Sequence, residues 1–361
     1  MQSLLHSSAY HYILFAETYD VTGAGIKTWV PDEPARFFQI PTKRFGRRFY
    51  AQRGLVRLAL RKDIDAIIYT GDAQYLTTWL SAGLARLTGK RVLFWTHGWL
   101  RDEHGPKAWI RRTFYHLAHG LLLYGERARS IGARHGFDSN QLYAIFNSLD
   151  YEQQKQFREK VTLEQIQATR QRLFEYPQRP VVIFVGRLIP SKRVDLLLAA
   201  LSELAQLGHL VNAIIVGDGP ERERLEQICI QQGLSAKFMG GSYDEASLSV
   251  LLMSANVTVS PGNAGLLVMH SLAYGTPVIT HDDLDRQMPE TEAITPGING
   301  ALFRYNDCHD LARTILAWTQ HVLPSEQIRA QCYGIIEQYY NPEYQKFVIE
   351  RAISGQAAGD A

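Results

Sequence analysis

The chain has 361 residues, of which 46% are hydrophobic and 20% are charged. These proportions are typical of a soluble globular protein and exclude a disordered, collagen-like or coiled-coil chain. The formal net charge is only +2, but it is unevenly distributed: residues 1–150 hold 20 Lys and Arg against 12 Asp and Glu, whereas the remaining residues hold 18 against 24. Such asymmetry indicates that the first half contacts something anionic.

The cysteine content and the hydropathy pattern predict a cytoplasmic location. Cys229, Cys308 and Cys332 are far apart and have no metal-ligand spacing, which excludes a disulfide framework or a cysteine-based zinc site and fits a reducing cytosol. No apolar run approaches the roughly 20 residues that span a bilayer. The N-terminus lacks the basic region and the cleavage site of a signal peptide.

Short apolar segments alternate with helix-length segments along the chain, a pattern typical of parallel α/β domains. In the first half the predicted strands are residues 11–16, 66–69, 92–96, 121–124 and 143–146. In the second half they are residues 181–185, 213–216, 237–239, 257–260 and 278–280. At about 150 residues per domain, the length also predicts two domains.

The segment between the two sets of strands predicts a domain boundary. Residues 151–179 are rich in Gln, Lys, Arg and Glu, and their pattern favours an amphipathic helix followed by a hinge next to Pro180. We therefore expect domains at residues 1–150 and 180–340, with residues 151–179 as the linker helix and hinge and residues 341–361 as a C-terminal helix and tail. Ligands bind at the carboxyl edges of parallel strands, so the expected site is the cleft between the two domains.

The strongest local pattern is at residues 181–201, VVIFVGRLIPSKRVDLLLAAL. A buried strand ends at Gly186, Arg187 follows at once, and Lys192 precedes an amphipathic helix. Two cations beside a helix N-terminus favour a phosphate or diphosphate ligand. The alternative is the solvated basic start of an ordinary helix.

Two further strand–turn–helix patterns follow. In AIIVGDGPERERLEQ, a strand leads into Gly217 and Gly219, which permit close backbone approach; alone, this pattern indicates no more than a tight turn with Pro at the helix start. In residues 257–280, VTVSPGNAGLLVMHSLAYGTPVIT, a helix is expected to begin near Gly265 and to end at Gly275. Its free N–H groups are donors for a phosphate, whereas His270 within it could be a structural residue.

Together, and in this order, the three segments resemble the family-4 (group 1) glycosyltransferases of the GT-B fold, which transfer a sugar from a nucleotide-sugar donor with retention of anomeric configuration. The resemblance continues in FMGGSYDEASLSVLLMSANVTVSPG and in residues 289–303, PETEAITPGINGALF. It is looser in the first half, at FWTHGWL (94–100) and IFNSLD (145–150). It implies two Rossmann-like domains with doubly wound parallel sheets that face each other across a cleft, and a C-terminal helix that crosses back to the N-terminal domain.

The resemblance also implies roles for individual residues. Arg187 and Lys192 match the residues that hold the donor diphosphate, and His97 matches the histidine that contacts the transferred sugar; these three are the predicted catalytic residues. The predicted donor-binding residues are at the strand edge, the turn before the third helix, that helix, and the hinge: Gly186, Met239, Asn263, Gly265, Leu266, Leu267, His270, Asn147 and Ser148.

The chain departs from the family at two places. The family has two glutamates eight positions apart, the first contacting the sugar and the second the ribose; here these positions are Gly262 and His270. His270 can still hydrogen-bond ribose or phosphate, whereas Gly262 has no side chain, so that Asn263 beside it is the candidate sugar contact. At the N-terminus, residues 22–25 are a poor substitute for the family's Gly-rich loop, which indicates a rebuilt loop or a missing first strand.

Residues 41–62 contain eight basic residues, no acidic residue and several interleaved aromatics, and a second basic and aromatic patch follows at residues 107–115. This composition suits an anionic membrane surface, where each cation contributes about 1 kcal/mol. The alternative is an amphipathic helix that packs its apolar face on the domain. No nucleic-acid recognition motif is present, so no nucleic-acid partner is expected. The predicted membrane contacts are Lys43, Arg44, Arg47 and Arg48.

These patterns predict a retaining glycosyltransferase that transfers a sugar from a nucleotide-diphosphate sugar to a glycan acceptor. The acceptor is expected to be lipid-linked, in lipopolysaccharide or capsule synthesis, and the protein to lie peripherally on the inner face of the cytoplasmic membrane. Because cationic groups would stabilise the leaving diphosphate, no metal or other cofactor is expected. Two alternatives stay open: a non-catalytic nucleotide-sugar-binding protein of a polysaccharide assembly complex, and a GT-B nucleotide-sugar epimerase.

Overall fold

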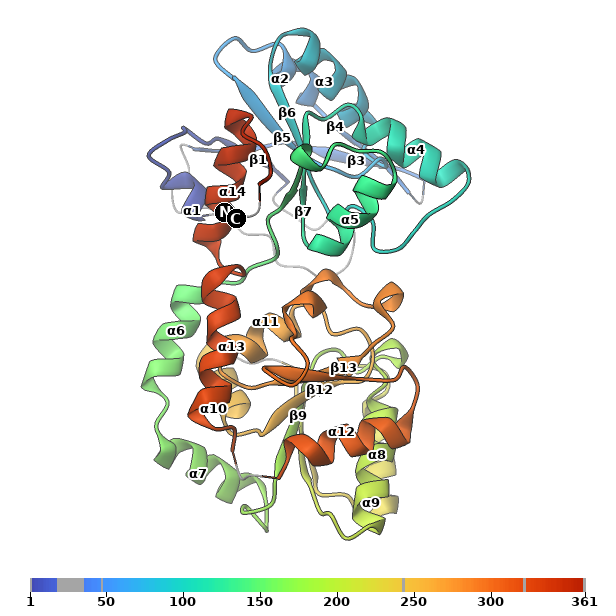
Figure 1. The fold of residues 1–361 in the computed structure, drawn as a ribbon, viewed down its shortest axis with the longest axis vertical. Helices are drawn as coiled ribbons and strands as arrows, with labels where there is room; N and C mark the ends of the chain where they lie inside the picture. Colours follow the sequence, from blue (N-terminus) through green and yellow to red (C-terminus); the bar gives the residue numbers. More distant parts are fainter. Residues whose placement is uncertain (1, 18–35, 47, 242–243, 321–322, 360–361) are drawn as a thin grey trace. The chain divides into compact units, whose positions relative to one another are not determined.

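The computed structural model describes residues 2–17, 36–46, 48–241, 244–320 and 323–359. The chain forms two compact units (Figure 1): unit 1 consists of Met1–Phe146 and Pro342–Ala361, and unit 2 of Asn147–Asn341. Within the described ranges, no helix is long and apolar enough to cross a membrane.

Unit 2 contains a parallel six-stranded sheet in the order β11-β10-β9-β12-β13-β14. The chain moves outward in one direction from β9 to β11 and in the other from β12 to β14. The sheet is therefore doubly wound, with its topological switch point between β9 and β12. The strands are β9 (Val181–Val185), β10 (Asn212–Val216), β11 (Ala236–Gly240), β12 (Val257–Ser260), β13 (Val278–His281) and β14 (Gly300–Phe303).

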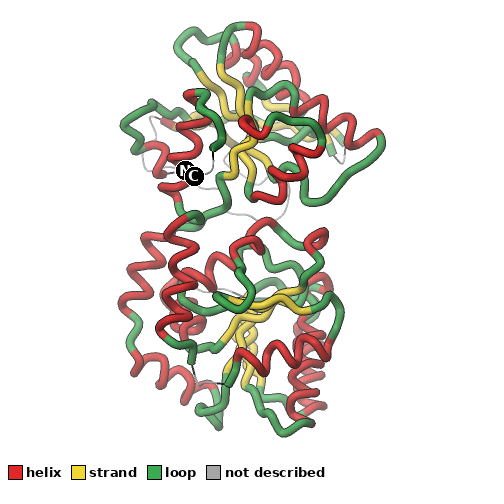
Figure 2. The backbone as a smooth tube through the Cα atoms, viewed as in Figure 1, coloured by secondary structure: helices red, strands yellow, loops and turns green. Residues whose placement is uncertain are grey.

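Helices cover both faces of this sheet, as Figure 2 shows. Successive side chains of a strand point to opposite faces, so Val182 and Phe184 pack against α8 (Val194–Gln206), α9 (Arg222–Gln232) and α12 (Cys308–Trp318). Val181 and Ile183 instead pack against α7 (Leu163–Leu173) and α10 (Glu245–Met253). The remaining helices of unit 2 are α6 (Tyr151–Lys160), η3 (Pro190–Lys192), α11 (Leu267–Ala273), η4 (Leu284–Arg286), η5 (Pro289–Ala293) and α13 (Glu326–Gln338).

The segment predicted as one linker helix and a hinge contains two helices, α6 and α7. The second begins with a capping box, in which the side chains of Thr162 and Gln165 each accept a hydrogen bond from the other's backbone N–H. Both helices contact α10, and both belong to unit 2. The sequence pattern shows the helical propensity of this segment but not the local capping signal that divides it.

Unit 1 contains a parallel four-stranded sheet in the order β5-β6-β7-β8. Its strands are β5 (Ala66–Thr70), β6 (Arg91–Thr96), β7 (Gly120–Leu123) and β8 (Leu142–Ala144). One face packs against α2 (Leu55–Ala59), α3 (Leu76–Leu87), α4 (Pro106–Tyr115) and α5 (Glu126–Arg134). The other face packs against α1 (Gln2–Leu5) and the C-terminal helix α14 (Pro342–Ser354), whose Val348 and Ile349 are buried there.

Among the described residues, the secondary structure of the first 60 differs most from the one predicted from the sequence. The strand predicted at residues 11–16 is present as β1 (Leu14–Ala16), but it pairs with β2 (Phe37–Gln39) in a separate two-stranded sheet. The basic stretch forms the antiparallel hairpin β3 (Thr42–Phe45) and β4 (Phe49–Gln52), followed by the short helix α2. The alternative of an amphipathic helix packed on the domain therefore holds only for α2, whose Leu55 and Ala59 are buried in the core of the unit, whereas residues 42–45 and 49–52 are strands. Residues 22–25 lie outside the described residues.

Candidate functional site

The candidate site lies at the carboxyl edge of the unit 2 sheet, at the switch point. Two loops leave the sheet there: residues 186–193 after β9, which we call loop A, and residues 261–266 after β12, which we call loop B. Ligands of doubly wound sheets bind at this position. Most of the residues predicted from the sequence to bind the donor are in these two loops or directly after them.

Loop A is held in place by the glycine-rich turn after β10. Gly186 N donates to Val216 O (2.9 Å), and Leu188 N donates to Asp218 O (2.9 Å). A Cβ atom on Gly217 would lie 2.9 Å from the carbonyl carbon of Gly186 and closer still to its oxygen. The glycine-rich turn therefore supports loop A, which presents Arg187 as an exposed residue.

Lys192 connects loop A to loop B. Its Nζ donates to both Asn263 O (2.7 Å) and Asn263 Oδ1 (2.6 Å), and its carbonyl accepts from Gly262 N (3.1 Å). Burial lowers the pKa of Lys192, and the negative charge of Glu290 acts in the opposite direction. The predicted phosphate ligand is thus a partly buried cation that also holds the loops together.

Gly262 packs directly against the backbone of loop A. A Cβ atom there would lie 2.8 Å from Lys192 Cα and closer still to the carbonyl oxygen of Ser191. This packing leaves no room for a glutamate, which gives a physical reason for the first departure from the family. Asn263, predicted as the sugar contact, already uses its Oδ1 to bind Lys192.

The helix after loop B begins at Leu267, two residues later than predicted, because Gly265 adopts a left-handed conformation with a φ of 55°. Ala264 N donates to Gln287 Oε1 (3.0 Å), and Val268 N donates to Gly265 O (3.1 Å). For the intervening N–H groups of Gly265, Leu266 and Leu267, the described part of the chain supplies no acceptor. Three adjacent unbonded donors suit an anionic ligand.

His270 belongs to a polar cluster that we call the Glu245 network: Gln154, Glu245, His270 and Tyr274. His270 Nδ1 lies 3.0 Å from Gln154 Nε2 and 3.4 Å from Glu245 Oε1. The same carboxylate oxygen accepts from Tyr274 OH (2.7 Å) and Gln154 Nε2 (3.0 Å). Burial opposes ionisation of Glu245, but these hydrogen bonds, that of His270 foremost, outweigh it and lower its pKa to about 2.

A second carboxylate close to the loops is that of Glu290 on η5, for which the sequence predicts no role. It is only 3% exposed, and its Oε1 accepts from Asn147 Nδ2 (2.8 Å). Asn147 Oδ1 in turn accepts from Ser148 N (3.0 Å), so the two predicted hinge residues are joined to this carboxylate. The segment PETEA was part of the family resemblance, but nothing in the sequence indicated which of its glutamates is buried.

Two of the predicted residues lie away from the loops. Met239 is on β11, two strands from β9 in the sheet. His97 belongs to unit 1, where it follows β6 at the carboxyl edge of that sheet. Its ring centroid is 4.7 Å from that of Tyr124. The next residue, Gly98, has a φ of 62°, and a Cβ atom there would lie 2.7 Å from Leu123 Cδ2, so the backbone beside His97 has little freedom.

The basic hairpin in unit 1 exposes both charge and aromatic surface. Phe45 and Phe49 are opposite each other across the hairpin and are 51% and 48% exposed. Lys43, Arg44 and Arg48 are exposed as well, whereas Arg47 lies outside the described residues. On α4, in the second basic and aromatic patch, Trp109 is 69% exposed.

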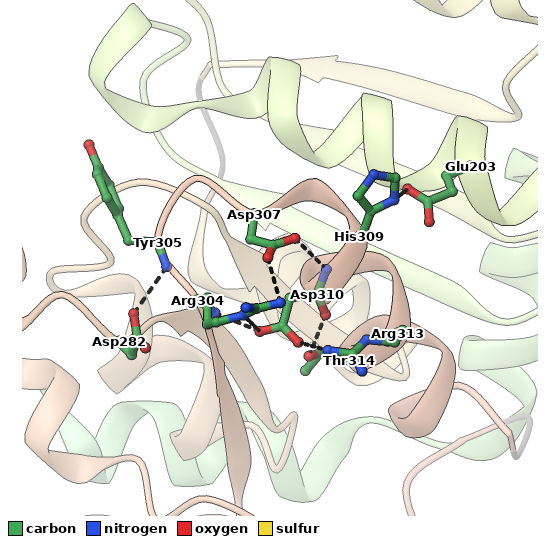
Figure 3. Close-up of polar contacts among 9 residues, drawn as sticks. All are labelled: Glu203, Asp282, Arg304, Tyr305, Asp307, His309, Asp310, Arg313 and Thr314. Atoms are coloured by element: carbon green, nitrogen blue, oxygen red, sulfur yellow. Dashed lines mark hydrogen bonds and ion pairs between the residues drawn. The ribbon is translucent and has the colours of Figure 1, made fainter.

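Another polar cluster lies at the carboxyl end of β14 (Figure 3). Asp307 accepts from Asp310 N (2.9 Å) as the cap of α12, and its carboxylate lies 2.7 Å from Arg304. Asp310 accepts from Arg304 N (2.7 Å) and binds Arg313. These charges compensate one another and fix the start of α12. Among the described residues, no group of three or more His, Cys, Asp or Glu could hold a metal ion.

Residues 165–331, most of unit 2, match the family model described as "Glycosyl transferases group 1". Among curated proteins, the GDP-mannose-dependent alpha-(1-6)-phosphatidylinositol dimannoside mannosyltransferase of Mycobacterium tuberculosis is 35% identical over 122 residues, 33% of this chain and 30% of that protein. The alpha-D-kanosaminyltransferase of Streptomyces kanamyceticus is 26% identical over 179 residues, 48% of this chain and 45% of that protein. The matched regions thus span less than half of either relative.

Solved structures resemble the chain over a greater length. The Anabaena protein HepE in complex with UDP has a TM-score of 0.65 at 19% identity and covers 83% of this chain and 81% of its own. The lipopolysaccharide outer core galactosyltransferase WaaB has a TM-score of 0.62 at 17% identity, with coverages of 83% and 78%. At these identities the likeness shows the fold, which is that of the GT-B glycosyltransferases.

Proposed function

We propose that this protein is a retaining glycosyltransferase that takes its sugar from a nucleotide-diphosphate donor. One observation carries the proposal: at the switch point of unit 2, the partly buried cation Lys192 and three adjacent unbonded N–H groups lie in neighbouring loops. The group 1 glycosyltransferase match covers the same loops. Both cationic and N–H donors bind phosphate oxygens, so this edge of the sheet suits a diphosphate.

The chemistry that these residues can support is departure of the diphosphate. As the bond between the sugar and the diphosphate breaks, negative charge develops on the leaving phosphate, and Arg187, Lys192 and the N–H groups of loop B would stabilise it. In a retaining front-face reaction, the acceptor hydroxyl forms the new bond on the face that the phosphate leaves. Its proton passes to the leaving phosphate, so that no separate base and no metal ion are required. In this proposal His97 orients the sugar.

We propose that the acceptor is a lipid-linked glycan in bacterial lipopolysaccharide or capsule synthesis, reached from the inner face of the cytoplasmic membrane. Relatives named for a phosphatidylinositol dimannoside and for the lipopolysaccharide outer core support this class of acceptor. The exposed cations and aromatic rings of the β3–β4 hairpin support an anionic membrane surface as the docking partner.

Calorimetry and turnover assays with UDP- and GDP-sugars and a mixed pool of glycan acceptors test the proposal. Arg187→Ala and Lys192→Met should each weaken donor binding and lower turnover by about 10- to 1,000-fold, the range for loss of an electrostatic stabiliser. Lys237→Ala, which removes an exposed cation from β11, is the matched control. Kinetics equal to those of the parent in both variants would exclude the site, and an inverted anomeric centre in the product would exclude retention.

A non-catalytic nucleotide-sugar-binding protein is the second candidate, and the closed packing around Gly262 favours it. It predicts donor binding without any transfer or hydrolysis. Release of nucleoside diphosphate in the turnover assay separates the two candidates. If the protein is an enzyme, the parent releases nucleoside diphosphate and the Lys192→Met variant releases far less; if it only binds the donor, neither releases any.

A further inference from the structure

Glu290 is a buried carboxylate with only one of its two oxygens bonded. Oε1 accepts from Asn147 Nδ2 (2.8 Å), whereas Oε2 is buried and has no hydrogen-bond partner among the described residues. Leaving a buried acceptor unbonded is unfavourable, and more so for a charged group. The bond from Asn147 holds the carboxylate through the other oxygen, so Oε2 is a buried acceptor that the described residues leave unbonded.

The surroundings of Glu290 connect it to the candidate site. Gln287 lies two residues before η5, the short helix that carries Glu290. Its Oε1 accepts both from Ala264 N of loop B (3.0 Å) and from Thr291 Oγ1 of η5 (3.2 Å). Glu290 is also close enough to Lys192 for its charge to raise the pKa of that amine against the effect of burial. The Glu290 carboxylate thus lies close to the loops that we propose bind the diphosphate.

The other side chains around loop B are poorly placed to bind a sugar as acceptors. Gly262 leaves no space for a side chain, because the backbone of Ser191 and Lys192 packs against it. Asn263 Oδ1 already accepts from Lys192 Nζ. A transferred sugar carries several hydroxyl donors, and a buried carboxylate is a strong acceptor for them.

We propose that Glu290 binds the transferred sugar by accepting a hydrogen bond from one of its hydroxyl groups through Oε2. The proposal rests on the proposed function and adds a sugar contact that discriminates between a nucleoside diphosphate and its sugar derivative. Asn147 acts as its positioning residue, since it holds the carboxylate through the other oxygen.

The test compares binding of UDP with UDP-glucose, and of GDP with GDP-mannose, by calorimetry on the full chain. Glu290→Gln has nearly the same shape, and its amide oxygen can still accept from Asn147, but it loses the charged acceptor. Affinity for the sugar nucleotide should fall about 10-fold or more, the value of a hydrogen bond to a charged group, while affinity for the nucleoside diphosphate stays within about twofold. Glu292→Gln on the same short helix η5 is the matched control and should change neither affinity.

Each other outcome overturns a different claim. If the parent binds neither nucleotide nor sugar nucleotide, the proposed function fails, and the inference fails with it. If the parent binds both but Glu290→Gln weakens neither, or weakens both equally, the sugar contact is wrong while the proposed function stands. Should Glu290→Gln not fold, Glu290→Asp takes its place, because it keeps the charge but draws the carboxylate back, and the same selective loss of sugar-nucleotide affinity is expected.

Discussion

Gly262→Ala should destabilise unit 2, although it adds only one methyl group. The new Cβ atom would lie 2.8 Å from Lys192 Cα, 2.9 Å from Lys192 C and closer still to Ser191 O. All three are backbone atoms, which cannot move aside by a change of rotamer. Overpacking of this kind costs about 1–3 kcal/mol. For a unit of this size, each kcal/mol lowers the midpoint of thermal unfolding by about 2–4 °C, so we expect a decrease of about 2–12 °C.

A second substitution in the same unit provides the control. Gly334 is exposed in the interior of α13, and a Cβ atom there would meet no atom within 4 Å. Gly334→Ala should therefore stabilise the helix by about 0.5–1 kcal/mol. Scanning calorimetry of the parent and both variants measures the difference, and UDP and GDP binding should weaken only in Gly262→Ala, because loop A must shift and carry Lys192 with it. If both alanine variants unfold at the parent's temperature or above, the steric argument is refuted.

Three further predictions concern the Glu245 network and the basic hairpin. Glu245→Gln should lower the free energy of unfolding at pH 7 by about 1–3 kcal/mol. Because the pKa of Glu245 is lowered from 4.5 to about 2, the extra stability of the parent is complete above pH 4.5 and should shrink as the pH falls towards 2. Urea unfolding measures it, and a stability difference between the two proteins that does not narrow on acidification contradicts the prediction. His270→Glu would set a second carboxylate beside that of Glu245, so this variant should be less stable than the parent at pH 7 and should regain stability when Glu245→Gln is added. Stability equal to the parent's without that second change would refute the repulsion. Replacement of three hairpin cations, Lys43, Arg44 and Arg48, by glutamate should reduce binding to anionic vesicles by about 100-fold or more, at about 1 kcal/mol per cation. If the parent binds neutral vesicles as tightly as anionic ones, docking is not electrostatic.

The predicted strands of the second half are all present, and four of them, β9, β10, β12 and β13, are buried on both faces. Such strands are mostly apolar runs, and β9, β10 and β12 are each followed by a glycine or proline turn and then by a helix. β9 and β12 match the predicted bounds residue for residue. In the first half the same signal locates β5 to β8, but β2, β3 and β4 are missed, since they have only three or four residues each and none is a fully buried apolar run. In the second half β14 is missed as well.

The candidate site was only partly predictable, for a reason of geometry. Sequence motifs bring together residues that are close along the chain, so they located loops A and B and the residues within them. Glu245 and Glu290 come from other elements, α10 and η5, and their partners Gln154 and Asn147 are 91 and 143 residues away. Only the packing of the helices on the sheet brings these pairs together.

The absence of glutamates at positions 262 and 270 therefore has a structural explanation. A side chain at position 262 and the contact between loop A and loop B exclude each other, because the backbone of Lys192 occupies the space that a Cβ atom would need. Because loop A and loop B lie so close together, Lys192 Nζ can bind Asn263, and this contact fixes loop B, whose N–H groups remain unbonded. At position 270 a glutamate would face the ionised Glu245, whereas a histidine can share a hydrogen bond with it. The absence of a glutamate at each position thus has a structural cause in the neighbouring elements, and at position 270 the half-buried carboxylate of Glu245 already lies beside the side chain.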